Sequence, residues 1–319
     1  MKNIALFDTS IGSDNLGDQI IMEAVEGIIL DLFPNDYLIK FPTHDVISNP
    51  SYKLIKTCNN KFVGGTNLLT SDMKSYKLWK IDINDVKHIK EVILLGVGWL
   101  KYQGKPNQYT ANIYKQLLSK RHLHSVRDSY TEKQLKSIGI QNVINTSCPT
   151  MWGLTPEFCK QIPTKKASKV LFTLSEWKKE VEQDKKLINM LERNYSEVYF
   201  WSQGIYDFQY LQTIGCNKVK IISPSILAFD QFLLNNEVDY IGTRLHGGIR
   251  ALKCKKRSLV LAVDNRAVEI SKDTNLAVSN RYDFPSIENW INDEKPITIH
   301  LPIEKILEWK AQFNMAEST

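Results

Sequence analysis

The sequence predicts an α/β protein built from two doubly wound units, each a parallel sheet with helices on both faces. Short apolar runs alternate with amphipathic stretches along the chain, which is typical of parallel strands joined by helical crossovers. The alternation breaks in residues 151–168, where a glycine, two prolines and a lysine pair indicate a linker. The length of 319 residues suits two domains. We therefore expect an N-terminal domain over 1–155, a C-terminal domain over 165–300 and a closing helix over 301–319.

The first half of the chain shows its strands as short apolar runs. Residues 4–7 form such a run, and a polar loop and helical spacing over 20–32 follow it. Further runs predict strands over 92–96 and 123–126. A helix is expected to begin at Ser129, where Glu132 stands three residues later as in a capping box.

The second half repeats this pattern. Strands are expected over 170–173, 198–201, 219–222, 240–241 and 258–263. Helices are expected over 178–191, 226–234, 245–252 and 302–313. Doubly wound sheets bind ligands at the carboxyl ends of their strands, so the loops that follow the strands are the candidate sites.

Composition and charge narrow the class of protein. Lysine and arginine number 41 and aspartate and glutamate 35, for a net charge of +6. This excess is too small to predict nucleic-acid binding, but it fits an anionic small substrate or a weak attraction to an anionic membrane. The five cysteines are an odd number, and no two stand two residues apart. We expect neither disulfides nor a metal site, and no required cofactor.

The chain is expected to act in the cytoplasm. Asp8 arrives too early for the apolar core of a targeting segment, and the cysteine pattern favours a reducing compartment. The longest apolar run, 92–100, is far shorter than the roughly 20 residues that span a bilayer. A basic cluster over 253–257 either complements the end of its helix or attracts the protein peripherally to the inner membrane face.

The loop after the first strand carries small and acidic residues where a helix begins. Its backbone N–H groups can approach an anion, although it matches neither a dinucleotide fingerprint nor a P-loop. Asp18 either caps the helix together with Asn15 or acts as a base. The candidates in this loop are Asn15, Gly17 and Asp18.

Two further strand exits lie in the first half. The pair Gly64-Gly65 either only permits a tight turn or contacts an anion. Arg127 follows a buried strand and precedes a helix. Its guanidinium either pairs with Asp128 or binds a carboxylate or phosphate through two parallel hydrogen bonds.

The loops of the second half carry a histidine between an arginine and two glycines. His246 can transfer protons at neutral pH, and Arg244 can hold an anion. Trp201 closes a strand and either belongs to the core or stacks on a sugar. One more strand exit holds Asp264, Asn265 and Arg266. There the aspartate either binds a hydroxyl of a sugar or ribose or caps the following helix.

Four of these motifs, taken in order, resemble the polysaccharide pyruvyltransferase family. They are Asn15-Leu16-Gly17-Asp18, Gly64-Gly65, Ser125-Val126-Arg127-Asp128 and Arg244-Leu245-His246-Gly247. The resemblance covers nearly the whole chain, and Cys148-Pro149-Thr150 also fits it. Thr66 stands where many members of the family have a third glycine.

This resemblance implies a GT-B-like fold, two Rossmann-like domains with an interdomain cleft, the acceptor on the N-terminal side and the donor on the C-terminal side. It implies transfer of pyruvate from phosphoenolpyruvate onto two hydroxyls of a sugar in bacterial capsule or exopolysaccharide biosynthesis. Catalysis would use His246, Asp18 and Arg127, with Asp18 and His246 on different domains. The donor would contact Arg127, Arg244, Leu245 and His246.

The acceptor we expect is a hexose such as galactose, free or in a lipid-linked oligosaccharide, which would receive a 4,6-ketal. Two other functions remain compatible with the residues. A GT-B glycosyltransferase would place the ribose of a nucleotide sugar on Asp264 and the diphosphate on Arg244. A non-catalytic protein that binds sugar phosphates would use the same scaffold without turnover.

Overall fold

The computed structural model describes residues 1–216 and 218–314 and divides into two compact units. Of the described residues, unit one comprises 1–13, 21–152 and 301–314, and unit two comprises 14–20 and 153–300. The sequence predicted domains over 1–155 and 165–300 and a closing helix over 301–319, whose last five residues lie outside the described part. Two segments belong to other units than this prediction gave them. Residues 14–20 pack with unit two, and the last helix packs within unit one. Asp18 therefore belongs to the same unit as His246, not to a different one.

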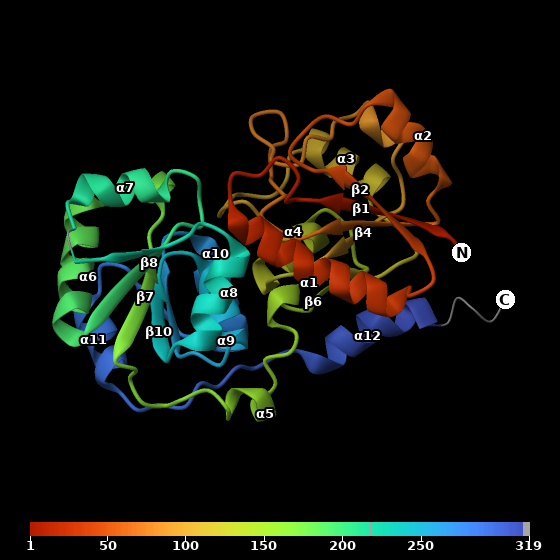
Figure 1. Ribbon diagram of the computed structural model, residues 1–319. Coiled ribbons are helices and arrows are strands. Elements are labelled where there is room, and N and C mark those ends of the chain that lie inside the picture. The colour runs from red at the N-terminus through yellow and green to blue at the C-terminus, as the bar shows by residue number, and fades with distance from the viewer. Residues whose placement is uncertain (217, 315–319) are drawn as a thin grey trace. The chain divides into compact units, whose positions relative to one another are not determined.

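Unit one contains a parallel sheet in the order β2-β1-β3-β4 (Figure 1). Its strands are β1 (Asn3–Asp8), β2 (Tyr37–Pro42), β3 (Asn60–Gly64) and β4 (Val92–Leu95). The parallel pair β5 (His124–Val126) and β6 (Val143–Asn145) lies beside β4, joined to it through a bridge between Val97 and Val126. The order 2-1-3-4-5-6 reverses direction between β1 and β3, and doubly wound sheets bind ligands at such a switch point.

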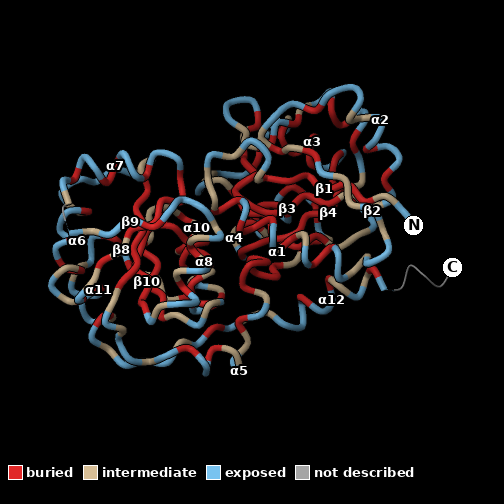
Figure 2. The backbone as a smooth tube through the Cα atoms, in the orientation of Figure 1, coloured by how far each residue is buried: buried red, intermediate tan, exposed pale blue. Residues whose placement is uncertain are grey.

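Helices cover both faces of the sheet in unit one. They are α1 (Leu16–Leu32), α2 (Asn49–Thr57), α3 (Gln108–Leu117), α4 (Ser129–Ser137) and α12 (Ile303–Asn314), with short 3-10 turns at Asp85–Lys87 and Pro149–Met151. Alternate residues of β1 pack into two different hydrophobic cores on opposite faces of the sheet. Ala5 and Phe7 belong to one core, and Ile4 and Leu6 belong to the other. Burial on both faces explains why this strand is a continuous apolar run, and the strands form the buried centre of the unit (Figure 2).

Unit two contains a parallel sheet in the order β12-β11-β10-β7-β8-β9. Its strands are β7 (Lys169–Thr173), β8 (Glu197–Trp201), β9 (Lys220–Ile222), β10 (Val238–Gly242), β11 (Ser258–Ala262) and β12 (Val278–Asn280). Counted from the first strand of the unit, this is the order 3-2-1-4-5-6 of dinucleotide-binding sheets. The direction reverses between β7 and β10, so the residues after these strands stand at the switch point.

The helices of unit two also form two layers. They are α5 (Pro156–Cys159), α6 (Val181–Asn194), α7 (Asp207–Ile214), α8 (Ile226–Asn235), α9 (Leu245–Lys253), α10 (Asn265–Thr274) and α11 (Phe284–Asn292), with a 3-10 turn, η3, at Glu176–Lys178. Phe172 of β7 packs in a core with side chains of α6, α7 and α11. Its neighbour Leu171 packs in another core with side chains of α8 and α9.

The structure confirms the predicted fold class of parallel sheets covered by helices. Strands stand where the apolar runs predict them, but α1 begins at Leu16, ahead of the expected position 20. The predicted capping box is wrong: the cap of α4 is Asp128, whose Oδ1 accepts from Thr131 N–H at 2.7 Å. Glu132 instead accepts from Asn145 N–H at 2.9 Å.

Candidate functional site

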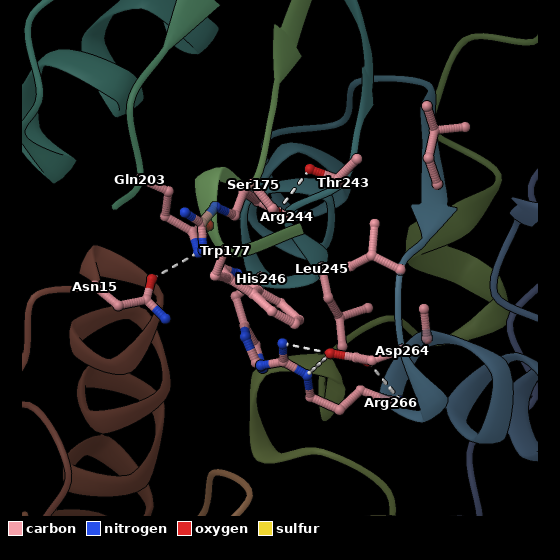
Figure 3. A pocket seen from close by; sticks show the side chains of 13 residues that line it. Asn15, Ser175, Trp177, Gln203, Thr243, Arg244, Leu245, His246, Asp264 and Arg266 are labelled. Carbon is pink, nitrogen blue, oxygen red and sulfur yellow. Dashed lines mark hydrogen bonds and ion pairs between the residues drawn. The ribbon is translucent and has the colours of Figure 1, made fainter. Parts of the chain in front are cut away.

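A pocket lies within unit two at the carboxyl ends of its strands, beside the switch point (Figure 3). Ser175 follows β7, Gln203 follows β8, and Arg244 and His246 follow β10. The remaining lining residues are Asn15, Trp177, Thr243, Leu245, Leu261, Val263, Asp264, Arg266 and Ala267. The free space is about 20 Å³, which is room for about one water molecule. A larger ligand therefore requires lining side chains to move.

The start of α1 forms one wall of this pocket. Leu16 N–H donates to Gln203 O at 2.8 Å, and Gln203 Nε2 donates to Asn15 Oδ1 at 2.9 Å. Asn15 Oδ1 also accepts from Gly17 N–H at 2.9 Å, so Asn15 caps the helix as one of its two interpretations predicted. A Cβ at Gly17 would lie 2.5 Å from Gln203 Nε2, so only glycine lets the helix approach this closely.

Asp18 lies in the first turn of α1 and is buried. It does not line the pocket, but its charge acts on Arg266, which does. Burial disfavours the charged guanidinium of Arg266, yet the carboxylates of Asp264 and Asp18 outweigh burial and raise its pKa. This position fits an electrostatic role, and a role of Asp18 as a base stays a prediction.

Arg244 is held in place by a buried carboxylate that follows a different strand. Its Nε donates to Asp207 Oδ2 at 3.0 Å and to Leu174 O at 3.0 Å, and its Nη2 donates to Asp207 Oδ1. Asp207 is fully buried and also accepts from Gly204 N–H at 2.8 Å and from Glu176 N–H at 3.1 Å. Among the described residues these contacts use Nε and one N–H of Nη2, so Nη1 and the second N–H of Nη2 can donate to a ligand.

His246 lies in the first turn of α9 and is 4% exposed. The two glycines that follow it allow close packing, because a Cβ at Gly248 would lie 2.8 Å from Val260 Cγ2. Gly247 N–H donates to Gln203 Oε1 at 3.1 Å. The sequence predicted that Leu245 and His246 belong to a site, and both line the pocket.

The loop after β11 supplies the opposite wall. Asp264 caps α10, its Oδ1 accepting from Arg266 N–H at 2.8 Å, and its Oδ2 accepts from Arg266 Nε at 2.8 Å. The capping interpretation of Asp264 is therefore confirmed, while the same carboxylate still faces the pocket (Figure 3). Asn265 is buried behind it, and neither polar atom of its side chain has a hydrogen-bond partner.

Unit one has its own candidate at the carboxyl ends of β3, β4 and β5. Arg127 is 1% exposed, and its Nε approaches Asp128 Oδ2 at 3.3 Å. Nη1 and Nη2 of the same guanidinium are buried without a partner. A Cβ at Gly98 would lie 2.2 Å from Nη2, so this glycine makes room for the guanidinium. Arg127 thus pairs with Asp128 through Nε, while its Nη1 and Nη2 have no partner among the described residues.

Gly64 and Gly65 pack tightly against neighbouring atoms. A Cβ at Gly65 would lie 1.9 Å from Gly96 O, and one at Gly64 would lie 2.8 Å from Met22 Sδ. Gly65 N–H already donates to Leu95 O at 2.9 Å. These contacts support the tight-turn interpretation, and a ligand contact of the two glycines stays a prediction.

Buried polar atoms without a partner gather at these strand ends. Nine such side-chain atoms occur in the described residues, and three are indole nitrogens of Trp79, Trp201 and Trp309. The other six belong to Thr9, Asn67 and Arg127, in loops that follow strands, and to Asn265, the first residue of α10. Native proteins satisfy nearly all buried polar groups, so these six atoms are candidates for contacts with a ligand or an ordered water.

Sequence reasoning missed several residues of the pocket in unit two, namely Ser175, Trp177, Gln203 and Thr243. Gln203 and Gly204 follow a strand, and that signal could have found them. The interpretation of Trp201 as a sugar platform is wrong, since its ring is buried and stacks on Phe229 at 4.0 Å.

The described residues show neither a metal-binding cluster nor a membrane-spanning helix. They contain no group of three or more histidine, cysteine, aspartate or glutamate side chains placed to hold a metal ion. None of the helices they form is long and apolar enough to cross a bilayer.

Comparison with solved structures identifies the class of fold. A UDP-GlcNAc 2-epimerase from Methanocaldococcus jannaschii is 12% identical, with a TM-score of 0.56 over 97% of this chain and 100% of that one. A putative UDP-N-acetylglucosamine 2-epimerase from Listeria monocytogenes is 10% identical, with a TM-score of 0.55 over 100% of this chain and 97% of that one. At such identities the likeness concerns the fold alone, and that fold is the predicted GT-B-like one with two Rossmann-like units.

The family follows from the sequence model that matches the chain. The model for polysaccharide pyruvyl transferase matches residues 15–265. The chain therefore belongs to the polysaccharide pyruvyltransferase family, as its motifs predicted. It is a transferase of that class, and its acceptor is a sugar or polysaccharide. No curated protein matches it.

Proposed function

We propose that the protein transfers pyruvate from phosphoenolpyruvate onto two hydroxyls of one hexose and forms a 4,6-ketal on a sugar such as galactose. The product would serve bacterial capsule or exopolysaccharide biosynthesis. The enzyme would work in the cytoplasm, where a lipid-linked oligosaccharide at the inner membrane face can serve as acceptor. Membership of the family supports the class of reaction, and the donor and acceptor are the proposal.

The observation that carries this proposal is that Nη1 and Nη2 of Arg127 have no partner among the described residues. Both nitrogens are buried, and a buried donor left unsatisfied is unfavourable. Two parallel N–H groups match a carboxylate or a phosphate. Phosphoenolpyruvate carries both groups, so Arg127 recovers its missing hydrogen bonds when the donor binds.

The transfer consumes two hydroxyl groups and releases one phosphate. C3 of phosphoenolpyruvate takes up a proton, which leaves positive character on C2. One sugar hydroxyl attacks C2 and loses its proton, the bond from C2 to the phosphate oxygen breaks, and the second hydroxyl forms the second C–O bond. Of the two hydroxyl protons, one balances the proton on C3 and the other leaves on phosphate.

The residues of unit two supply proton transfer and charge. His246 takes protons from the sugar hydroxyls and returns one to the donor, because imidazole exchanges protons near neutral pH. Nη1 of Arg244 binds an anionic group of the donor, and Leu245 shapes the adjoining wall. Asp18 and Asp264 balance the charge of Arg266, and Asp18 favours the positive character that develops on C2.

The test combines a turnover assay with matched glycine variants. Purified protein is mixed with phosphoenolpyruvate and a panel of methyl hexopyranosides and lipid-linked oligosaccharides. Phosphate release is followed, and the ketal methyl group is identified by NMR. We expect His246→Ala and Arg127→Lys to lower kcat/KM by about 100-fold or more. Gly98→Ala should weaken donor binding because its Cβ displaces Arg127, whereas Gly104→Ala, where space is open, should not.

Three outcomes would contradict the proposal. The first is full ketal formation by folded His246→Ala and Arg127→Ala variants. The second is no phosphate release by wild-type protein with any acceptor in the panel. The third is thermal stabilisation by UDP-, GDP- or CMP-sugars but not by phosphoenolpyruvate, which would favour a nucleotide-sugar glycosyltransferase.

A further inference from the structure

We infer that Trp177 is the platform on which the sugar ring of the acceptor stacks. This inference rests on the proposed function, since it takes a sugar to be the acceptor, and it places that sugar in unit two and not on the N-terminal side that the family resemblance implies. Trp177 lines the pocket of unit two together with His246 (Figure 3). The indole would bind the apolar C–H face of a hexopyranose and hold its hydroxyls toward the polar wall of the pocket.

The exposure of Trp177 sets it apart from the other tryptophans. Its side chain is 43% exposed, whereas Trp79, Trp99, Trp201 and Trp309 are at most 1% exposed. Trp152 and Trp290 are half-buried. A large aromatic group left in water at the mouth of a polar pocket forgoes the stabilisation of burial, and a bound sugar ring would restore it.

The backbone around Trp177 is fixed from both sides. Glu176 N–H donates to the buried Oδ1 of Asp207, which also binds Arg244. Lys178 O accepts from Arg281 Nη1 at 2.7 Å, and Arg281 Nη2 pairs with the buried Asp184 at 2.5 Å. Hydrogen bonds at both ends of the short turn η3 therefore connect it to two buried ion pairs, one between Arg244 and Asp207 and the other between Arg281 and Asp184. A side chain presented by such a turn is pre-organised to bind.

Two cations, Lys178 with its Nζ 5.8 Å from the ring centroid and Arg266, lie near the indole, and amide groups complete its surroundings. Arg266 lies with its Cζ 5.5 Å from the ring centroid and is paired with Asp264. Asn15 and Gln203, which line the same pocket, provide amide groups. Hydrogen-bonding groups beside an aromatic face match the hydroxyl rim and the C–H face of a hexopyranose.

The first test measures kinetics with a conservative rescue. Trp177→Ala should raise the KM for a methyl hexopyranoside by about tenfold and leave the KM for phosphoenolpyruvate within about twofold. Trp177→Phe should restore most of the loss because it keeps an aromatic face. Tyr206→Ala is the matched control, since Tyr206 is 55% exposed on the neighbouring loop and does not line the pocket. An unchanged acceptor KM in Trp177→Ala would overturn the inference.

The second test needs no turnover and separates this inference from the proposed function. Methyl galactoside, glucoside and mannoside are titrated into the protein without donor while tryptophan emission is recorded. We expect a saturable change with at least one glycoside in wild type and none in Trp177→Phe. A change that persists in Trp177→Phe, or no change in wild type, would overturn the inference. Lack of phosphate release in wild type would refute pyruvyl transfer, while the titration still decides the role of Trp177.

Discussion

Arg127 and Arg244 follow strands in the same way, but their guanidinium groups are held differently. Asp207 binds two nitrogens of Arg244, which fixes its plane and compensates its charge. Asp128 contacts only Nε of Arg127, at 3.3 Å. Two nitrogens of Arg127 have no partner among the described residues, so we expect this guanidinium to gain more hydrogen bonds from an anion than Arg244 does.

Removing the carboxylate of Asp207 tests how Arg244 is positioned. Asp207→Asn should lower the free energy of unfolding by about 3–5 kcal/mol, since it leaves a buried guanidinium without its counter-charge. The matched control is Asp230→Asn, which breaks the partly exposed pair with Arg250 and should cost about 1 kcal/mol or less. Urea unfolding of both variants measures the difference. Equal losses would contradict the buried role of Asp207.

The sequence could locate the residues that stand directly after strands. Arg127, Arg244, His246 and Asp264 follow apolar runs, so their place at the sheet edge was predictable. Asp207 was not, because its partner Arg244 lies 37 residues away and meets it only once the sheet has formed. Exposure was predictable in part. Trp201 ends an apolar run, which favours burial, and Trp177 stands among charged residues. The place of Trp177 beside a pocket depends on the folded sheet.

At the scale of elements, the N-cap of one helix that follows a strand also lines the pocket, and the N-cap of another does not. The N-cap of α10 is Asp264, which also pairs with Arg266 and faces the pocket. The N-cap of α8 is Ser225, whose Oγ accepts from Ala228 N–H at 3.1 Å and does not face the pocket. Both helices have 10 residues, so the two caps can be compared directly.

Replacing each cap by alanine separates stability from activity. Asp264→Ala and Ser225→Ala should each lower the free energy of unfolding by about 1 kcal/mol, the usual worth of an N-cap. Asp264→Ala should also lower kcat/KM, because Arg266 loses its nearest carboxylate, whereas Ser225→Ala should leave turnover unchanged. Thermal unfolding and the phosphate-release assay check both expectations. Full activity in Asp264→Ala would show that this carboxylate only caps the helix.

The strands that the sequence did not predict share one structural cause. They are β2, β6 and β12, which stand at the edges of their sheets. An edge strand is covered on fewer sides, so its residues need not be apolar. Tyr37 of β2, for example, is 62% exposed. Apolar runs therefore revealed most of the central strands and the edge strand β9, but left these three edges unrecognised.

At the scale of the whole molecule, the order of the strands decides which loops can carry chemistry. Unit one has the order 2-1-3-4-5-6 and unit two the order 3-2-1-4-5-6, each with a switch point next to its first strand. Alternating apolar runs predict parallel sheets but contain no information on this order, since pairing joins segments far apart in the chain. Three of the four family motifs carry it indirectly, because they follow β1, β3 and β10, which flank the switch points, whereas the motif with Arg127 follows β5.

The stability of the molecule should fall in mild acid because of a buried histidine in unit one. His124 is fully buried, accepts from Leu94 N–H at 3.2 Å through Nδ1, and bonds Ser119 O at 2.9 Å through Nε2. The hydrogen bond to Ser119 favours the imidazolium, but burial outweighs it, and the pKa falls from 6.5 to about 4. His122, which is half-buried, also has a lowered pKa because of burial and Arg121.

The direction of this pH effect follows from whether the folded or the unfolded protein binds the proton at His124. In the unfolded chain His124 binds a proton below about pH 6.5, whereas in the folded protein its pKa of about 4 keeps it neutral until lower pH. The free energy of unfolding should therefore decrease as pH falls through this window, by up to about 1.4 kcal/mol per pH unit. Urea unfolding between pH 7 and 5 measures the slope, and the exposed His300→Gln variant should keep it. In wild type, the imidazole NMR signal of His124 should not titrate above about pH 5. A titration near pH 6.5 would contradict the assignment.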